Sequence, residues 1–295
     1  MTSAGTGSGG TGEPAAPGPF SYWSIRVGKI DLSSPVVMGI LNLTPDSFSD
    51  GGELANEEAA LRRAETLLAG GAGILDVGGE STRPGAEPVP EEEEMARVLP
   101  MIRLLHESGL GPISVDTRTA QVAREAIRSG AQIVNDVSGL RHDPMMARVV
   151  AEEGAGLVLS HMRGTPATMR DLATYQDVAK EVTAELSESL DAALASGVRR
   201  ECVVVDPGIG FAKTGALSLE LLRDLASLRA LECPILVGPS RKSFIGELTG
   251  VPPAERVPGT IAACVLALLN GARLFRVHDV VPVVQALEVA RGILG

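Results

Sequence analysis

The amino-acid sequence predicts an α/β protein built as a (β/α)8 TIM barrel. Eight short apolar runs recur along the 295 residues, and longer segments of helical periodicity follow them, for example at 57–68, 119–129, 177–195 and 217–228. Every run also stops at a polar or ionisable residue: Asn42, Asp76, Asp116, Asn135, His161, Asp206, Ser240 and Arg276. Because such barrels carry their chemistry at the carboxyl ends of the strands, these polar termini predict an enzyme.

The first part of the chain is expected to lie outside the barrel. Residues 1–18 are mostly Gly, Ser, Thr, Ala and Pro without a basic start or an apolar core, which predicts a flexible, disordered tail rather than a signal peptide. Residues 21–32 alternate in polarity and predict a short hairpin. The remainder, 19–295, is long enough for one barrel domain, and 44% hydrophobic residues suffice for its core.

Composition restricts the partners of this protein. A net charge of −11 argues against a general nucleic-acid or anionic-membrane surface. Cys202, Cys233 and Cys264 match no metal-site spacing and are expected to be reduced core residues of a cytoplasmic protein. The uncharged stretch 257–272 is too short and interrupted to span a bilayer. It predicts either a helix shared with a partner subunit or a buried barrel helix, and we favour the homodimer.

A weak repeat indicates where helices end. Gly-Ala pairs at 71–72, 130–131, 154–155 and 271–272 each precede an apolar run. They predict helix C-caps that lead into the next strand.

The loops after the first two strands are rich in polar groups. The segment ILNLTPDSFSDGG (40–52) could bring Asn42 and Asp46 towards a cation or phosphate, or could be an ordinary Pro-Asp turn. Ser81, Thr82 and Arg83 form a candidate anion clamp. The acidic run 91–94 is expected to be a solvated helix start.

Three strand-end residues should converge in the barrel mouth: Asp116, Asn135 and Asp206. Two carboxylates and an amide could bind a flat heterocycle rich in N–H groups, or they could form a divalent-metal cage. The sequence leaves this choice open.

The later loops predict close ligand contact and anion binding. DPGIGFAKT (206–214) lacks the spacing of a nucleotide fingerprint, and its glycines would let backbone and Phe211 approach a ligand. Ser240 is expected to cap a helix whose first turn holds Arg241, Lys242 and Ser243.

The eighth strand supplies two further basic residues. Arg276 and His278 lie where many barrels bind phosphate. Alternatively, Arg276 pairs with Asp279 at the surface and His278 makes a structural hydrogen bond. His161, a lone histidine, is expected to be structural rather than the catalytic base.

Taken in order, the motifs NLTPDSFSDGG, GGESTRPGA, SVDT, NDVSG, HMRGTPATM, DPGIGFAKT, SRKSFIG and RVHDV resemble those of the dihydropteroate synthases of folate biosynthesis. The resemblance runs from about Val36 to the C-terminus. It implies a (β/α)8 transferase, commonly a homodimer, a sulfonamide target and dependent on Mg2+. The implied reaction condenses 6-hydroxymethyl-7,8-dihydropterin diphosphate with 4-aminobenzoate after dissociative loss of diphosphate.

The resemblance also implies roles for residues at matching motif positions. It assigns pterin binding to Asp116, Asn135, Asp206 and Lys242, and Mg2+ binding to Asn42. It assigns diphosphate binding to Thr82, Arg83, Arg276 and His278. It assigns contacts with 4-aminobenzoate to Phe48, Pro84, Phe211 and Ser243. The catalytic set is Arg83, Asp116, Lys242 and Arg276.

The chain departs from the family pattern at two places. Ala212 stands where the family usually has Gly, and Gly259-Thr260 stands where Gly-Ser is common. Both changes are small and concern local loop conformation.

Two other functions fit the barrel less well. A methyltetrahydrofolate–corrinoid methyltransferase would not need the TPDSFSDGG, STRPG or RVH segments. A non-catalytic pterin-binding paralogue should have lost its leaving-group residues, yet Arg83, Lys242, Arg276 and His278 are all present.

Overall fold

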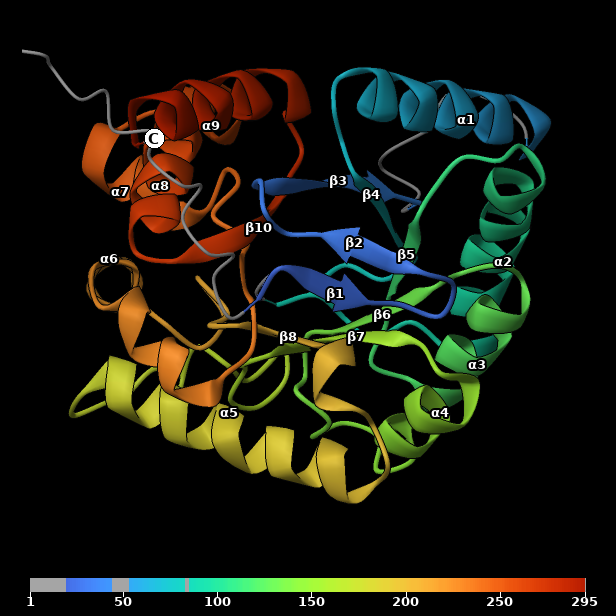
Figure 1. The fold of residues 1–295 in the computed structure, drawn as a ribbon, viewed down its shortest axis with the longest axis horizontal. Helices are drawn as coiled ribbons and strands as arrows, with labels where there is room; N and C mark the ends of the chain where they lie inside the picture. Colours follow the sequence, from blue (N-terminus) through green and yellow to red (C-terminus); the bar gives the residue numbers. More distant parts are fainter. Residues whose placement is uncertain (1–19, 44–52, 83–84, 295) are drawn as a thin grey trace, which may run out of the picture.

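Eight parallel strands form a closed barrel inside a ring of helices, as the sequence predicts (Figure 1). The computed structural model describes residues 20–43, 53–82 and 85–294, without the side chains of 53–56, so the predicted tail lies outside the described residues. Around the barrel the strands follow in the order β10, β3, β4, β5, β6, β7, β8 and β9. They are β3 (Val36–Asn42), β4 (Ile74–Gly78), β5 (Ile113–Asp116), β6 (Ile133–Asp136), β7 (Gly156–Ser160), β8 (Val203–Asp206), β9 (Ile235–Val237) and β10 (Ala272–Val277).

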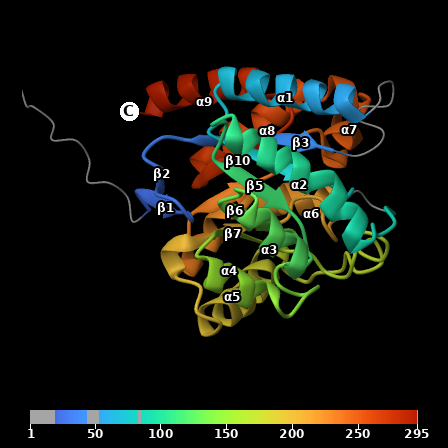
Figure 2. The ribbon, with the colours of Figure 1, turned by 90° about the vertical axis from the view of Figure 1, so that its right-hand side faces the viewer.

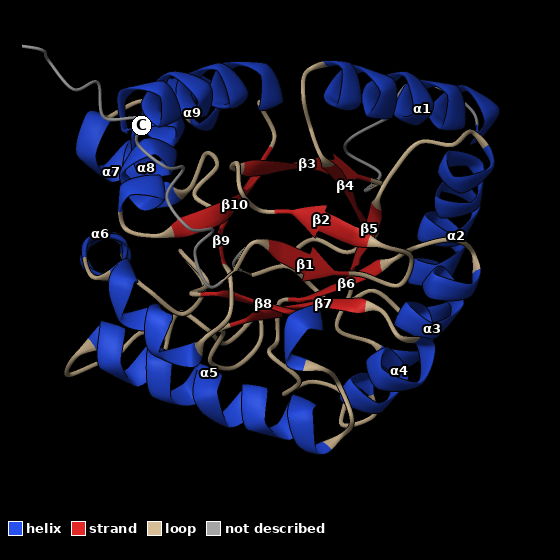
Figure 3. Cartoon of the chain, viewed as in Figure 1, coloured by secondary structure: helices blue, strands red, loops and turns tan. Residues whose placement is uncertain are grey.

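Helices alternate with the strands and cover the outside of the barrel (Figure 3). They are α1 (Glu53–Ala69), α2 (Glu91–Glu107), α3 (Ala120–Arg128), α4 (Met146–Glu153), α5 (Val178–Ala195), α6 (Gly215–Arg223), α7 (Ser243–Thr249), α8 (Val257–Leu269) and α9 (Val280–Leu294). The helical segment predicted over 217–228 is divided in the structure: α6 ends at Arg223, and a 3-10 helix follows over Leu225–Leu231.

The predicted hairpin is confirmed and closes the amino-terminal end of the barrel. Its strands, β1 (Tyr22–Ser24) and β2 (Lys29–Asp31), pair antiparallel and lie across that opening (Figures 1 and 2). The Trp23 side chain is fully buried, and its indole Nε1 donates to the carbonyl of Cys202 at 2.8 Å. It packs, with Ile25 and Leu32, on inward-facing strand residues: Met38, Ile74, Ile133, Val158, Val204, Leu236 and Leu274.

Successive side chains along each strand point alternately into the barrel and outward to the helices. In β4, for example, Ile74 belongs to the interior cluster, whereas Leu75 and Val77 belong to the larger core between strands and helices. Because successive side chains point to opposite faces, Asp76 lies on the same side as Ile74, inside the barrel.

The Gly-Ala pairs end helices as predicted. Gly71, Gly130, Gly154 and Gly271 all have positive φ angles, between 66° and 121°. Residues with side chains rarely adopt this conformation, which ends a helix and redirects the chain. A β-carbon at Gly130 would also overlap His106.

The three cysteines are buried and free. In the described residues, no helix combines the length and the apolar character that crossing a membrane requires.

Candidate active site

A polar layer follows the apolar interior layer, two residues further along several strands. The strand period of two places both members of each pair inside the barrel. The pairs are Ile74 and Asp76, Ile133 and Asn135, Val204 and Asp206, and Leu274 and Arg276. The layer therefore forms at the carboxyl-terminal end, where barrel enzymes hold their active sites.

Arg276 connects this layer. Its Nε donates to Asp76 Oδ2 and its Nη2 to Asp116 Oδ2, both at 2.6 Å. Asn135 Nδ2 donates to the same Asp76 oxygen at 3.2 Å. Burial raises the pKa of Asp116 to about 7, although the Arg276 cation acts in the opposite direction. One cation thus holds two buried carboxylates side by side.

Asp76 is a site residue that the motif assignment missed. The sequence marked it as a strand end but gave it no role. Its side chain is fully buried, and Oδ1 has no hydrogen-bond partner among the described residues. Its position in the middle of β4, two residues after Ile74, was the signal that could have identified it.

Asp206 and Lys242 face the same space from the opposite wall. Asp206 Oδ1 accepts from the Gly208 amide at 2.7 Å, and burial raises the pKa of this carboxyl group. Burial and the nearby Arg276 cation lower the pKa of Lys242 to about 8, and the Asp206 and Asp116 carboxylates oppose this shift. The Lys242 ammonium lies 4.0 Å from the centre of the Phe211 ring. The structure therefore brings Asp116, Asn135, Asp206, Phe211, Lys242 and Arg276 together.

Asn42 and Thr82 border this group. Asn42 ends β3 and is half-buried. A β-carbon placed on Gly78 would lie 3.5 Å from Asp116 Cβ and 3.8 Å from Asn42 Oδ1, so both side chains flank Gly78. Thr82 is half-buried after β4, whereas Phe48, Arg83 and Pro84, with Asp46, lie outside the described residues.

The helix after β9 begins later than predicted. Lys242 occupies the N-cap position and Ser243 is the first helical residue, so Ser240 is not the cap. Arg241 has a φ of +57°, which interrupts the helix before Lys242. The Ser240 hydroxyl instead contacts His278 Nδ1 at 3.0 Å. Ser243 is exposed.

The proposed pair between Arg276 and Asp279 does not form. Asp279 accepts from Arg241 at 2.6 and 2.8 Å. Arg276 is directed inward by its place in β10, and its carboxylate partners are Asp76 and Asp116. His278 does take part in a hydrogen bond, to Ser240.

Glu94 corrects the prediction of a solvated acidic run. Glu91, Glu92 and Glu93 are exposed, but Glu94 is buried under the loop that follows β4. Burial raises its pKa to about 7. Helical periodicity turns every fourth residue inward, and here that residue is an acid.

The two departures from the family pattern have local explanations. Ala212 has a φ of +48°, a left-handed conformation in which Gly is favoured. Gly259 leaves space that Ile245 fills. The Thr260 hydroxyl accepts from the Arg241 amide at 3.0 Å, which a serine hydroxyl could also do.

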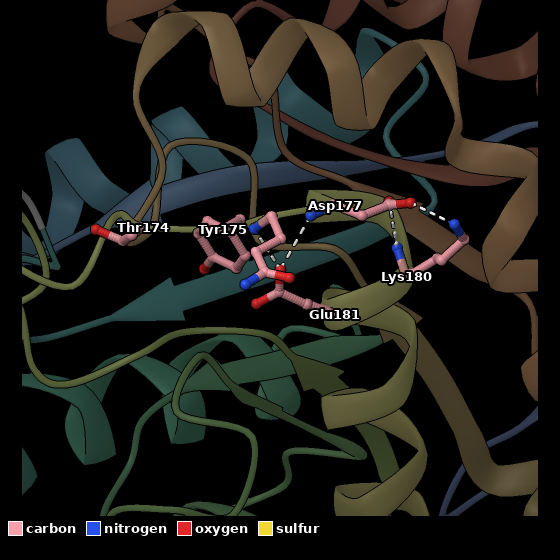
Figure 4. A pocket seen from close by; sticks show the side chains of 6 residues that line it. Thr174, Tyr175, Asp177, Lys180 and Glu181 are labelled. Atoms are coloured by element: carbon pink, nitrogen blue, oxygen red, sulfur yellow. Dashed lines mark hydrogen bonds and ion pairs between the residues drawn. The ribbon is translucent and has the colours of Figure 1, made fainter.

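A hollow of about 610 Å³ lies at the start of α5 (Figure 4). Figure 4 shows Asp177 and Lys180 directed at one another, and Glu181 directed at the backbone just before the helix. Glu181 accepts from the amides of Gln176 and Asp177, and Asp177 accepts from the Lys180 amide. These contacts cap the helix and leave few groups for a ligand.

Together, the closed barrel and the charged layer at its carboxyl-terminal end define a (β/α)8 enzyme with a buried site for a polar ligand. Residues 38–278 match the model of the pterin binding enzymes. A dihydropteroate synthase of Synechocystis sp. is 49% identical over 86% of this chain and 88% of its own length. Two solved structures are similarly close. The dihydropteroate synthase of Xanthomonas albilineans with 4-aminobenzoic acid has a TM-score of 0.87 and 44% identity, covering 93% of this chain and 98% of that one. The Yersinia pestis dihydropteroate synthase in a sulfonamide drug complex has a TM-score of 0.87 and 40% identity, covering 92% and 99%.

The chain therefore belongs to the pterin-binding enzymes and, within them, to the dihydropteroate synthase family of transferases.

Proposed function

We propose that this chain condenses 6-hydroxymethyl-7,8-dihydropterin diphosphate with 4-aminobenzoate, giving 7,8-dihydropteroate and diphosphate. The observation that carries the proposal is the buried layer in which Arg276 joins Asp76 and Asp116 opposite Asp206 and Lys242. The synthase relatives support the same reaction, and they count against the corrinoid methyltransferase alternative. The polar layer retains Arg276 and Lys242, and this counts against a non-catalytic pterin-binding paralogue.

Pterin recognition follows from the acceptors in this layer. An aminopyrimidinone edge offers several N–H donors, and buried carboxylates are strong acceptors for them. Asp206 uses Oδ1 for the Gly208 amide, which leaves Oδ2 for the ligand. Asn135 provides an amide that both donates and accepts, and Asp116 provides a further carboxylate. Lys242 would contact the ring from the Phe211 side.

Diphosphate would bind at the carboxyl-terminal end of the barrel, beside Arg276 and His278. Arg276 uses Nε and Nη2 for the two carboxylates, and its Nη1 makes no hydrogen bond to a described residue. That nitrogen could reach a phosphate oxygen, together with His278, Thr82 and Arg83. The positive charge would stabilise the leaving group as negative charge develops on it.

Asn42 is suited to help bind Mg2+. Its amide oxygen is a hard ligand beside Asp116, and Mg2+ commonly combines one or two protein oxygens with substrate phosphates and water. The described residues contain no group of three or more acidic, His or Cys side chains that would hold a metal alone, so substrate oxygens would complete the coordination. When bound, Mg2+ would neutralise charge on the departing diphosphate.

The protein's own residues would then separate opposite charges during a dissociative reaction. Arg276 would stabilise diphosphate, while the Asp116 and Asp206 carboxylates would stabilise the cationic pterin methylene. The amine of 4-aminobenzoate would attack that carbon from the side of Phe211 and Ser243. The resemblance to the family assigns Phe48 and Pro84, which lie outside the described residues, to the same substrate. No covalent bond to the protein is required.

We further propose that the protein acts as a homodimer. An apolar groove between α8 and α9 supports this proposal; it is lined by Ile261, Val265, Pro282, Gln285, Ala286, Val289, Ala290 and Ile293. Leu266 and Val289 are 59% and 64% exposed, which is unusual for large apolar side chains. The three free cysteines are compatible with a cytoplasmic location.

In the decisive experiment, the purified protein is incubated with pterin diphosphate, 4-aminobenzoate and Mg2+. The formation of dihydropteroate and diphosphate is measured. We expect both products in equal amounts, and we expect EDTA to abolish turnover. A folded protein that forms no dihydropteroate under these conditions would refute the proposed function.

A further inference from the structure

Lys213 is a buried lysine that neither the motif assignment nor the proposed reaction uses. It follows Ala212 on the loop between β8 and α6, and it is 7% exposed. Among the described residues its ammonium contacts no carboxylate directly. It donates instead to the carbonyl oxygens of Phe211 at 2.9 Å and Gly208 at 3.1 Å, and to His161 Nδ1 at 2.9 Å.

The two carbonyl contacts fix the turn that carries the pterin-facing groups. Both backbone groups of Gly208 are held, since its N–H donates to Asp206 Oδ1 and its C=O accepts from Lys213. Phe211 is held by its carbonyl, and its ring faces Lys242 at 4.0 Å. One ammonium group therefore sets the positions of the Asp206 turn and the Phe211 ring.

The third contact ties this turn to the end of β7. An ammonium group can only donate, so His161 Nδ1 is the acceptor and its Nε2–H donates to Glu185 at 3.1 Å. The His161 backbone amide also donates to the Asp206 carbonyl at 3.0 Å. Burial and the Lys213 cation lower the pKa of His161 to about 4, which agrees with a neutral ring.

Glu185 is in turn fixed from outside. Arg163 Nε and Arg141 Nη1 each donate to it at 2.9 Å. The chain of contacts thus runs from the surface of α5 through Glu185 and His161 to Lys213. Lys213 and His161 are buried members of this network, and such hydrogen-bonded networks hold their members in one arrangement.

We propose that Lys213 is a positioning residue for the transfer reaction, which holds Asp206 and Phe211 in the geometry that binds the pterin. It acts through the two carbonyls and touches no substrate. This inference rests on the proposed function, because it assumes that the pterin lies between Asp206, Phe211 and Lys242.

The test compares Lys213→Met, which keeps the length of the side chain but removes its donors, with Lys180→Met as the control. Lys180 is exposed, and among the described residues its ammonium group pairs with Asp177 alone. For Lys213→Met we expect at least tenfold weaker calorimetric binding of 6-hydroxymethyl pterin and a higher KM for the pterin diphosphate, with Lys213→Arg restoring part of both. Lys180→Met should stay within twofold of the wild type.

Unchanged pterin affinity and KM in a folded Lys213→Met protein, with only a lower Tm, would overturn the proposal. If Lys213→Met does not fold, Lys213→Gln decides the question, because its amide nitrogen is one bond closer to the backbone and cannot reach the three acceptors of the ammonium group. It should bind pterin more weakly than the wild type, and equal affinity would overturn the proposal. Failure of the wild type itself to bind pterin or form dihydropteroate would instead refute the proposed function, which separates the two outcomes.

Discussion

The two ends of the barrel interior are built on the same strands but have opposite chemistry. At the amino-terminal end, Trp23 and the inward residues around Ile74 and Leu274 exclude water. Two residues later, the strands present Asp76 and Arg276. The same inward face of each strand therefore serves both purposes. A step of two residues keeps a side chain inside the barrel but moves it from the sealed end to the ligand end.

Truncation of Trp23 at the sealed amino-terminal end should have the largest effect of the changes considered. It should lower stability without changing ligand binding. Trp23→Ala deletes a fully buried side chain and its hydrogen bond to Cys202, so we expect the free energy of unfolding to fall by roughly 3–5 kcal/mol. Pterin affinity, measured well below Tm, should not change. A large loss of affinity in the folded variant would contradict the separation between the two ends.

Removing the cation of the polar layer should mainly affect catalysis. Arg276→Ala leaves Asp76 and Asp116 without their shared partner and removes charge from the leaving-group side. We expect kcat to fall by about 10²- to 10³-fold, or roughly 3–4 kcal/mol. Affinity for a pterin without diphosphate should fall by a smaller factor. Equal losses in both measurements would place Arg276 among the pterin contacts rather than the diphosphate contacts.

Neutralising Asp206 tests recognition of the pterin itself. Asp206→Asn keeps the acceptor for the Gly208 amide but removes the charge and places a donor opposite an N–H group. Pterin binding should weaken by about 2–3 kcal/mol with little change in Tm. Calorimetry is the measurement, and wild-type affinity would exclude Asp206 as a contact.

Glu94 is a buried acid outside the polar layer, and its protonation should make stability depend on pH. Its folded-state pKa, about 7, lies above the usual 4.5, so folding favours the protonated form. This contribution to stability is complete below pH 4.5 and is lost as pH rises through 7. Glu94→Gln should therefore gain about 1–3 kcal/mol relative to the wild type between pH 5 and pH 8. A difference between the two proteins that does not depend on pH would contradict this.

Ala212 should give the smallest effect. Gly would relieve the left-handed conformation, worth about 1 kcal/mol, but would lose a buried methyl group of about 0.8 kcal/mol. The free energy of unfolding should change by less than about 1 kcal/mol in denaturant titration. A loss above about 2 kcal/mol would show that the methyl packing dominates.

Periodicity predicts well what depends on the local chain, and less well what depends on contacts between distant segments. The eight strands, the hairpin and the glycine C-caps follow from patterns within a few residues. The place of Ser240 outside the helix depends on Arg241 in a left-handed conformation and on His278 nearby. The burial of Glu94 depends on how α2 packs under the loop after β4.

The same limit applies to the candidate active site, where contacts between distant segments are not predicted from the sequence. Strand ends identified Asp116, Asn135, Asp206 and Arg276, because each ends or nearly ends an apolar run. No local pattern indicates a role for Asp76, because only the closed barrel brings Arg276, 200 residues away in sequence, into contact with it. Lys213 was missed for a similar reason, since His161 lies 52 residues before it.

The most direct test of the central claim is a crystal structure with 6-hydroxymethyl pterin bound. We expect its aminopyrimidinone edge to contact Asp206 and Asn135 in the polar layer, beside Asp116, with Lys242 and Phe211 on one side of the ring. Density for the pterin elsewhere, such as the hollow beside Tyr175, with the polar layer still closed by Arg276, would contradict it.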